Sequence, residues 1–124
     1  MPTRVFTGAV SIAHQWVAQV LKPGMIAVDA TAGNGRDTLF LARLVGKTGK
    51  IYAFDIQEEA LRKTRLLLET HGAFAQVRLI KDSHENLGTY IDEPVTVIMF
   101  NLGYLPGGNK KIVTRPETTL GALQ

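Results

Sequence analysis

A chain of 124 residues has room for one folded domain, and a hydrophobic fraction of 45% beside 20% charged residues is typical of a folded globular chain and argues against a disordered one. The absence of cysteine excludes disulfides and thiolate metal sites. A formal net charge of +3 permits an anionic partner without requiring one.

Composition also bears on the compartment and on metals. The three histidines (His14, His71 and His84) do not have the spacing of metal ligands, so we expect no metal. No apolar run approaches the ~20 residues of a membrane span, and the first residues lack a signal-peptide pattern. We therefore expect one cytoplasmic domain over residues 1–124, without a membrane partner.

The apolar residues, in chain order, predict alternating helices and strands. Helical spacing over residues 9–21 ends at Lys22-Pro23-Gly24. The later patterns predict strands at 26–29, 50–55, 76–80 and 95–100, and helices ending near 45, over 57–71, and from 82 to about 90. This alternation is typical of a doubly wound α/β domain with a parallel sheet, in which ligands bind at the carboxyl ends of the strands.

The end of the first of these strands carries Asp29 and the turn Gly33-Asn34-Gly35. The dinucleotide fingerprint requires a third glycine where this chain has Thr38. A carboxylate before the turn repels a pyrophosphate but suits the ammonium and sulfonium groups of S-adenosylmethionine. Two glycines alone leave open an ordinary turn between a strand and a helix.

Two further strand ends carry acids. Asp55 follows the glycine turn at about the ~20-residue interval at which an acid meets ribose hydroxyls, and the alternative is a helix N-cap with Glu58. The cluster Asp82-Ser83-His84-Glu85 follows the next strand, where an adenine would lie, and has capping-box spacing. Three such strand ends in order favour a nucleoside-binding crevice.

A glycine-rich loop beginning at Asn101 follows the strand at 95–100, where active-site loops of such folds lie. The Asn101 carbonyl groups can orient a nucleophilic N–H, and the Tyr104 ring can stack on a base. Lys110, Lys111 and Arg115 can hold phosphates. The alternatives are that Asn101 only ends the strand, that Tyr104 is a core residue and that the basic residues are solvated.

Five segments together resemble the family of bacterial "putative rRNA methylases", which are class I S-adenosylmethionine-dependent methyltransferases. They are residues 29–38 (DATAGNGRDT), 52–57 (YAFDIQ), 82–85 (DSHE), 100–110 (FNLGYLPGGNK) and 114–120 (TRPETTL). The resemblance implies a Rossmann-like parallel sheet of order 3-2-1-4, counting the four predicted strands along the chain. It also implies methyl transfer to RNA, since family members N-methylate the wobble 5-aminomethyl-2-thiouridine of tRNA.

The resemblance assigns residue roles as well. The implied cofactor-binding residues are Asp29, Gly33, Asn34, Gly35, Asp37, Thr38, Asp55, Ile56, Gln57, Asp82, Ser83, His84, Asn101 and Leu102. Asn101 and Tyr104 are the implied catalytic residues. The implied substrate-binding residues are Tyr104, Lys110, Lys111, Thr114 and Arg115.

The family fold has further strands after the fourth, and this chain looks truncated beside it. The strand at 95–100 would then form a sheet edge of apolar and β-branched residues. We therefore predict that the chain forms a homodimer through this edge or is marginally stable as a monomer. The alternative functions are an rRNA methyltransferase, a small-molecule methyltransferase, and a cofactor-binding fragment without its own activity.

Overall fold

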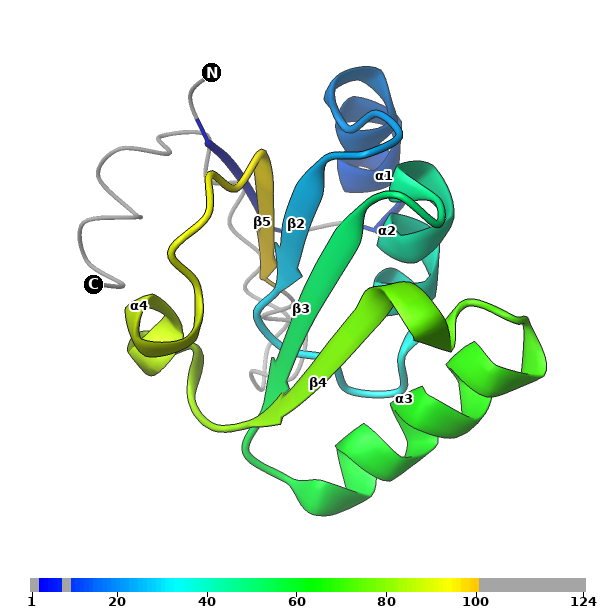
Figure 1. Cartoon of the computed structure of the whole chain (residues 1–124), viewed down its shortest axis with the longest axis vertical. Helices are drawn as coiled ribbons and strands as arrows, with labels where there is room; N and C mark the ends of the chain where they lie inside the picture. The colour runs from blue at the N-terminus through cyan, green and yellow to red at the C-terminus, as the bar shows by residue number, and fades with distance from the viewer. Residues whose placement is uncertain (1–2, 8–9, 101–124) are drawn as a thin grey trace.

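The computed structural model describes residues 3–7 and 10–100, which form a five-stranded sheet with helices on both faces (Figure 1). The strands are β1 (Arg4–Thr7), β2 (Ile26–Asp29), β3 (Lys50–Asp55), β4 (Val77–Lys81) and β5 (Val97–Phe100). The helices are α1 (Val10–Val20), α2 (Arg36–Val45), α3 (Glu58–Thr70) and α4 (Leu87–Tyr90), with 3-10 turns at Phe74–Gln76 and His84–Asn86. Each element predicted within these residues is present with bounds within two residues of those expected, except the helix predicted from 82 to about 90. That segment is a 3-10 turn at His84–Asn86 followed by α4.

The strands pair in parallel in the order β1-β5-β2-β3-β4. Val28 at the centre of β2 lies beside Tyr52 of β3 on one side and Ile98 of β5 on the other. For the four strands that the sequence predicted, this is the expected order 3-2-1-4. The fold prediction, a Rossmann-like α/β sheet, is confirmed.

Apolar side chains bury both faces of the sheet. On one face, α1, α2 and α3 pack through residues such as Val17, Leu41 and Leu68, all fully buried. On the other face, Leu87 of α4 and Ile91 cover Phe54 and Ile98 (Figure 1). Strands covered on both faces read as continuous apolar runs, which explains the unbroken pattern of β5.

The prediction that the strand at 95–100 forms an exposed edge is wrong. β1 pairs with β5 in parallel, from Arg4 beside Val97 to Thr7 beside Phe100, and Val5 is fully buried. β5 is therefore an inner strand with all four side chains buried. The expected homodimer through β5 loses its basis, because the backbone groups that would recruit another chain are already paired.

β1 itself is a short edge strand, and its Arg4 side chain is exposed. Short length and an exposed charge are features by which natural sheets limit pairing between chains. In residues 3–7 and 10–100, no helix is long and apolar enough to cross a membrane.

Candidate functional site

The predicted site segments meet at the edge of the sheet where β2, β3 and β4 end. Asp29 and Asp55 are the last residues of β2 and β3, and Asp82 follows β4 directly. Because neighbouring parallel strands end at one edge, the three acids lie in sequence across it.

Two glycines give the turn after β2 a conformation that other residues rarely adopt. Gly33 has a φ of 57° and Gly35 a φ of 90°, both in the left-handed region. A Cβ on Gly35 would lie 2.8 Å from the Cα of Thr64 in α3. The Thr64 hydroxyl also donates a hydrogen bond to the Gly33 carbonyl oxygen at 3.3 Å. The turn therefore depends on α3 as well as on its own backbone.

Most N–H groups of this turn already have acceptors inside the protein. Three N–H groups donate to side chains: Thr31 to Asp29 at 3.2 Å, Gly33 to Asp55 at 3.0 Å and Arg36 to Asn34 at 3.1 Å. Two donate to backbone carbonyls: Ala32 to Phe54 at 2.8 Å and Gly35 to Ala32 at 2.9 Å. Phosphate-binding turns instead present such N–H groups to the ligand. This arrangement favours a ligand whose end at the turn carries no phosphate.

Asp29 holds the turn from inside. Its side chain is buried, one oxygen accepts the Thr38 hydroxyl at 2.6 Å, and the other accepts the Thr31 N–H at 3.2 Å. Burial raises the pKa of Asp29 to about 7 against the lowering effect of these hydrogen bonds, and the negative charges of Asp37 and Asp55 add to the rise. Both oxygens of Asp29 are thus engaged within the protein.

Asp55 links the turn to a cavity. Its Oδ2 accepts the Gly33 N–H at 3.0 Å and its Oδ1 accepts the Gln57 N–H at 2.9 Å. Because α3 begins at Glu58 with Gln57 at its N-cap position, Asp55 is not the N-cap that the alternative proposed. Asp55 borders a cavity of about 500 Å³, and the 67%-exposed Ile56 side chain follows it in the chain. The cavity is lined by Thr31, Gly33, Asn34, Asp55, Gln57, Glu59, Ala60 and Lys63.

The turn after β4 is built around Asp82. Its Oδ1 accepts the Ser83 N–H at 2.6 Å and the Asn86 amide at 2.8 Å, and its Oδ2 accepts the Tyr90 hydroxyl at 2.7 Å. The hydrogen bond from Tyr90 is the largest cause that lowers the pKa of Asp82 below its usual value. The expected capping box is displaced by one residue, because Ser83 accepts the Glu85 N–H at 3.1 Å.

His84 lies edge-on to Phe100 of β5, with ring centroids 5.0 Å apart. Burial lowers the pKa of His84, although Glu85 opposes this effect. Its Nδ1 is buried without a hydrogen-bond partner in the described part of the chain. Buried polar atoms without a hydrogen-bond partner are rare in folded proteins, so this nitrogen beside the end of β5 is an unusual feature of the site.

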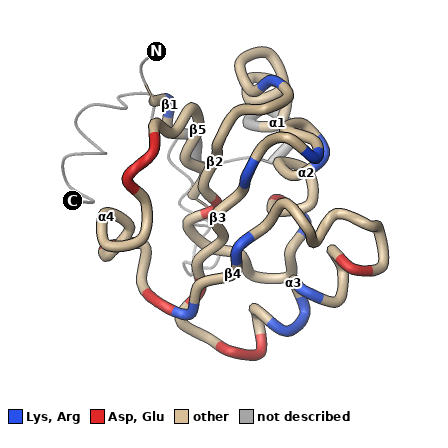
Figure 2. The backbone as a smooth tube through the Cα atoms, in the orientation of Figure 1, with Lys and Arg blue, Asp and Glu red and all other residues tan. Residues whose placement is uncertain are grey.

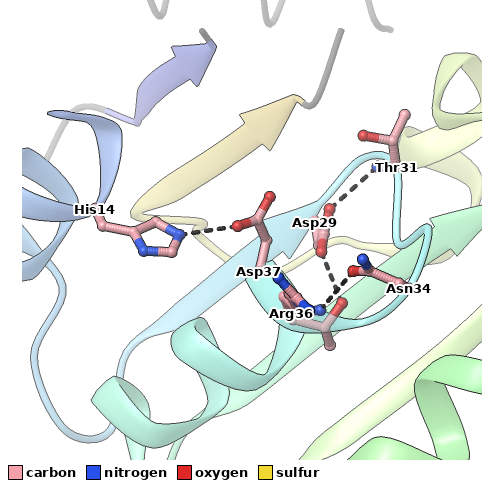
Figure 3. A network of polar contacts seen from close by, with 7 residues as sticks. His14, Asp29, Thr31, Asn34, Arg36 and Asp37 are labelled. Atoms are coloured by element: carbon pink, nitrogen blue, oxygen red, sulfur yellow. Dashed lines mark hydrogen bonds and ion pairs between the residues drawn. The ribbon is translucent and has the colours of Figure 1, made fainter. Parts of the chain in front are cut away.

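On the other side of the glycine turn, α1 meets α2 through a polar contact (Figure 3). The His14 Nε2 lies 2.8 Å from Asp37 Oδ1, and the His14 ring stacks on Phe40 at 3.8 Å between centroids with an interplanar angle of 8°. Asp37 and Thr38, both predicted as site residues, therefore begin α2 directly behind the turn.

The structure thus brings together the predicted residues of the strand ends β2, β3 and β4. The remaining predicted residues, Asn101, Leu102, Tyr104, Lys110, Lys111, Thr114 and Arg115, lie outside the described residues. Within the described ranges, no group of three His, Asp or Glu side chains is placed to hold a metal ion.

Sequence reasoning missed Thr64 and Lys63, which reach the site from α3. Lys63 is one of the basic residues of α3, and it borders the cavity. Thr64 is buried at an apolar position of the helix, so a polar residue on the buried face of α3 was the available signal.

Residues 51–124, more than half of the chain, match the family described as "Putative rRNA methylase". The chain belongs to this rRNA methylase family. The family resemblance stated from the sequence is therefore confirmed.

Relatives of this chain in the rRNA methylase family are named as methyltransferases or rRNA methylases. The "tRNA (mnm(5)s(2)U34)-methyltransferase, chloroplastic" of Arabidopsis thaliana is 40% identical over 126 residues, which cover 94% of this chain and 46% of that protein. The "putative rRNA-methylase" structure from Clostridium thermocellum is 48% identical with a TM-score of 0.78, covering 94% of this chain and 62% of that one. A "putative methyltransferase" from Streptococcus mutans, solved in complex with SAH, is 45% identical with a TM-score of 0.72, covering 92% and 61%.

The chain thus spans 46% of the Arabidopsis relative and 62% and 61% of the two bacterial structures.

Proposed function

We propose that this chain carries the S-adenosylmethionine-binding part of an RNA methyltransferase whose acceptor is tRNA. The position of Asp55 carries the proposal. Its carboxylate is bonded to Gly33 of the turn and borders the 500 Å³ cavity. Each carboxylate oxygen has a second lone pair, so Asp55 can also accept the two hydroxyls of a ribose.

The residues of the turn fit this cofactor better than a nicotinamide dinucleotide. The carboxylates of Asp37 and Asp55 supply negative charge beside the turn, where burial raises the pKa of Asp29 to about 7. This charge suits a ligand with ammonium and sulfonium groups. The N–H groups that would hold a pyrophosphate are engaged within the protein, as at Gly33 and Thr31.

In this proposal, Asp55, Ile56 and Gln57 hold the ribose, and Asp82, Ser83 and His84 lie on the adenine side. The turn at Gly33, Asn34 and Gly35, with Asp29, Asp37 and Thr38, holds the amino-acid end. The bound cofactor supplies an activated methyl group on a sulfonium. The protein's contribution is to align acceptor and donor and to exclude water.

We assign the acceptor to the segment after β5. Asn101 and Leu102 would border the transferred methyl group, with Asn101 orienting the acceptor N–H, and Tyr104 would stack on a base. Lys110, Lys111, Thr114 and Arg115 would bind phosphates. The finer assignment is N-methylation of the aminomethyl group at the wobble uridine, which the name of the Arabidopsis relative supports. Cytoplasmic placement stays a prediction, since that relative is named as chloroplastic.

The charges on α3 are a weaker choice for the RNA contact. This helix begins with two acidic residues, continues with basic residues at 62, 63 and 65, and has Glu69 near its end (Figure 2). Arg62 lies 3.2 Å from Glu59, and Arg65 lies 3.3 Å from Glu69, so their charges are largely balanced.

A second candidate is a cofactor-binding unit that needs further chain for turnover. The fraction of its relatives that the chain spans, 46% to 62%, favours it. Transfer of a tritiated methyl group to tRNA that lacks the modification separates the two candidates, with bulk rRNA and small amines as competing acceptors.

Calorimetry tests the cofactor assignment. We expect S-adenosylhomocysteine to bind and NAD not to bind. Asp55→Ala should weaken binding by roughly 1–3 kcal/mol, the scale of lost hydrogen bonds to a charged group. Asp92→Ala is the matched control, because it removes one exposed carboxylate that precedes β5. Equal effects of the two substitutions, or tight NAD binding, would contradict the assignment.

A further inference from the structure

The contact between His14 and Asp37 has a defined geometry. A carboxylate only accepts hydrogen bonds, so the His14 Nε2–H donates to Asp37 Oδ1 across 2.8 Å. Stacking on Phe40 fixes the plane of the imidazole ring. The His14 and Asp37 side chains are 25% and 12% exposed, so the pair is largely shielded from water.

The second oxygen of Asp37 points away from His14 (Figure 3). No residue in the described part of the chain donates a hydrogen bond to it. Asp29, by contrast, uses both of its oxygens inside the protein. Among the described residues, Asp37 is therefore the acid at this end of the turn with an oxygen that can accept a further hydrogen bond.

The place of Asp37 relative to Asp55 indicates what that oxygen can accept. Asp55 is the last residue of β3 and accepts the Gly33 N–H of the turn, whereas Asp37 lies beside His14 of α1 (Figure 3). A cofactor with its ribose at Asp55 and its chain running across the turn brings its amino-acid end toward α1. An ammonium group there would meet a carboxylate in a site of reduced water access, where charge pairing is stronger than in solution.

We propose that His14 is a positioning residue for the amino-acid end of the cofactor: its Nε2–H and its stack on Phe40 hold Asp37 so that the other carboxylate oxygen faces the ammonium group. The inference rests on the proposed function. It extends the site to α1 and assigns a role to His14, a residue outside the predicted site.

Two substitutions at His14 separate the hydrogen bond from the packing. His14→Phe keeps an aromatic ring against Phe40 but has no donor, whereas His14→Gln keeps a donor near the Nε2 position without the ring. Two ligands report on the ends of the site. S-Adenosylhomocysteine carries the ammonium group, and 5′-methylthioadenosine has the same nucleoside thioether without it.

We expect His14→Phe to weaken binding of S-adenosylhomocysteine about tenfold, the scale of one charge-assisted hydrogen bond, with methylthioadenosine binding changed by less than about twofold. His14→Gln should restore most of the lost affinity. Asp37→Asn keeps an acceptor for His14 but not a charged oxygen for the ammonium group, and should show the same selective loss.

Equal weakening of both ligands by His14→Phe and Asp37→Asn would show a merely structural role and overturn the proposal, as would unchanged affinities. If His14→Phe does not fold, the Asp37→Asn and His14→Gln measurements decide. Failure of the unsubstituted chain to bind either nucleoside would instead overturn the proposed function itself.

Discussion

The turns after β2 and β4 both begin with a carboxylate that is hydrogen-bonded within the turn, but the two carboxylates differ in burial and in the direction of their pKa shifts. Each begins with an acid at a strand end that accepts an N–H from the residues just after it, Thr31 for Asp29 and Ser83 for Asp82. Asp29 is fully buried and its pKa rises to about 7, whereas half-buried Asp82 has a lowered pKa. Hydrogen bonds favour both carboxylates, so burial decides the direction at Asp29.

The glycines of the two turns also differ in how closely other atoms pack against them. Gly35 has a positive φ and lies against the backbone of α3, whereas a Cβ on Gly88 in α4 would meet nothing within 4 Å. The β2 turn is therefore specified by close packing from a distant helix. The β4 turn is specified by local hydrogen bonds at the surface.

The largest expected effect is that of Gly35→Ala. A left-handed φ costs about 1–2 kcal/mol for a residue with a side chain, and overpacking against Thr64 adds about 1–3 kcal/mol. Chemical denaturation should show a loss of about 2–5 kcal/mol in unfolding free energy. Gly88→Ala is the matched control and should be neutral or slightly stabilising, because alanine favours helix. Similar losses from both substitutions would remove the contrast between the turns.

Asp29→Asn tests whether burial of the Asp29 carboxyl makes the stability of the protein depend on pH. The pKa of Asp29 is higher in the folded protein than the ordinary 3.8, so folding favours the protonated form and stability falls as pH rises from about 4 to about 7. The neutral asparagine lacks this dependence. The unfolding free energy of the variant relative to the original chain should therefore increase with pH, by up to about 4 kcal/mol between pH 4 and 8. A difference that is constant with pH would contradict the burial of a raised-pKa acid.

Tyr90→Phe should produce the smallest change, and it sharpens the contrast at Asp82. The substitution removes the hydroxyl that contributes most to the lowered pKa of Asp82 and keeps the ring, which lies edge-on to Phe54 at 5.7 Å. NMR titration should show the Asp82 pKa moving up toward 3.8.

The stability that Asp82 contributes is present above the ordinary pKa and is lost as pH falls through the lowered value. Tyr90→Phe should weaken this acid dependence, and Asn86→Ala should do so less. An Asp82 pKa that Tyr90→Phe leaves unchanged would assign the shift to the other two donors.

Sequence patterns predicted much of this architecture because the relevant signals are local. β2 and β3 have the predicted bounds, and Asp29 and Asp55 are their last residues, as predicted. The pairing of β1 was missed for two reasons. A segment of four residues is too short to show a periodicity, and its partner β5 lies far along the chain. The cap moved from Asp82 to Ser83 because the Asp82 carboxylate is taken by Tyr90, a residue that no spacing rule includes.

The site shows the same division. Asp55 was predicted from its interval to the glycine turn, and it does contact Gly33. Helical periodicity places Thr64 on a buried face, but it does not say that this face meets Gly35. The link between His14 and Asp37 depends on how two helices pack, and this information lies in the tertiary structure.

The pairing of β1 with β5 joins the two ends of the described chain. Thr3, just before β1, donates a hydrogen bond to the carbonyl of Val95, and 92 residues of sequence separate them. Closing a loop of that length costs about 4 kcal/mol of chain entropy, about 1 kcal/mol more than the loop between the adjacent strands β2 and β3. In the sheet, β5 is the strand that pairs with β1, so β1 is held only if β5 is in place. A chain from which β1 has detached would expose the β5 backbone on that side, which is the condition that favours pairing between chains.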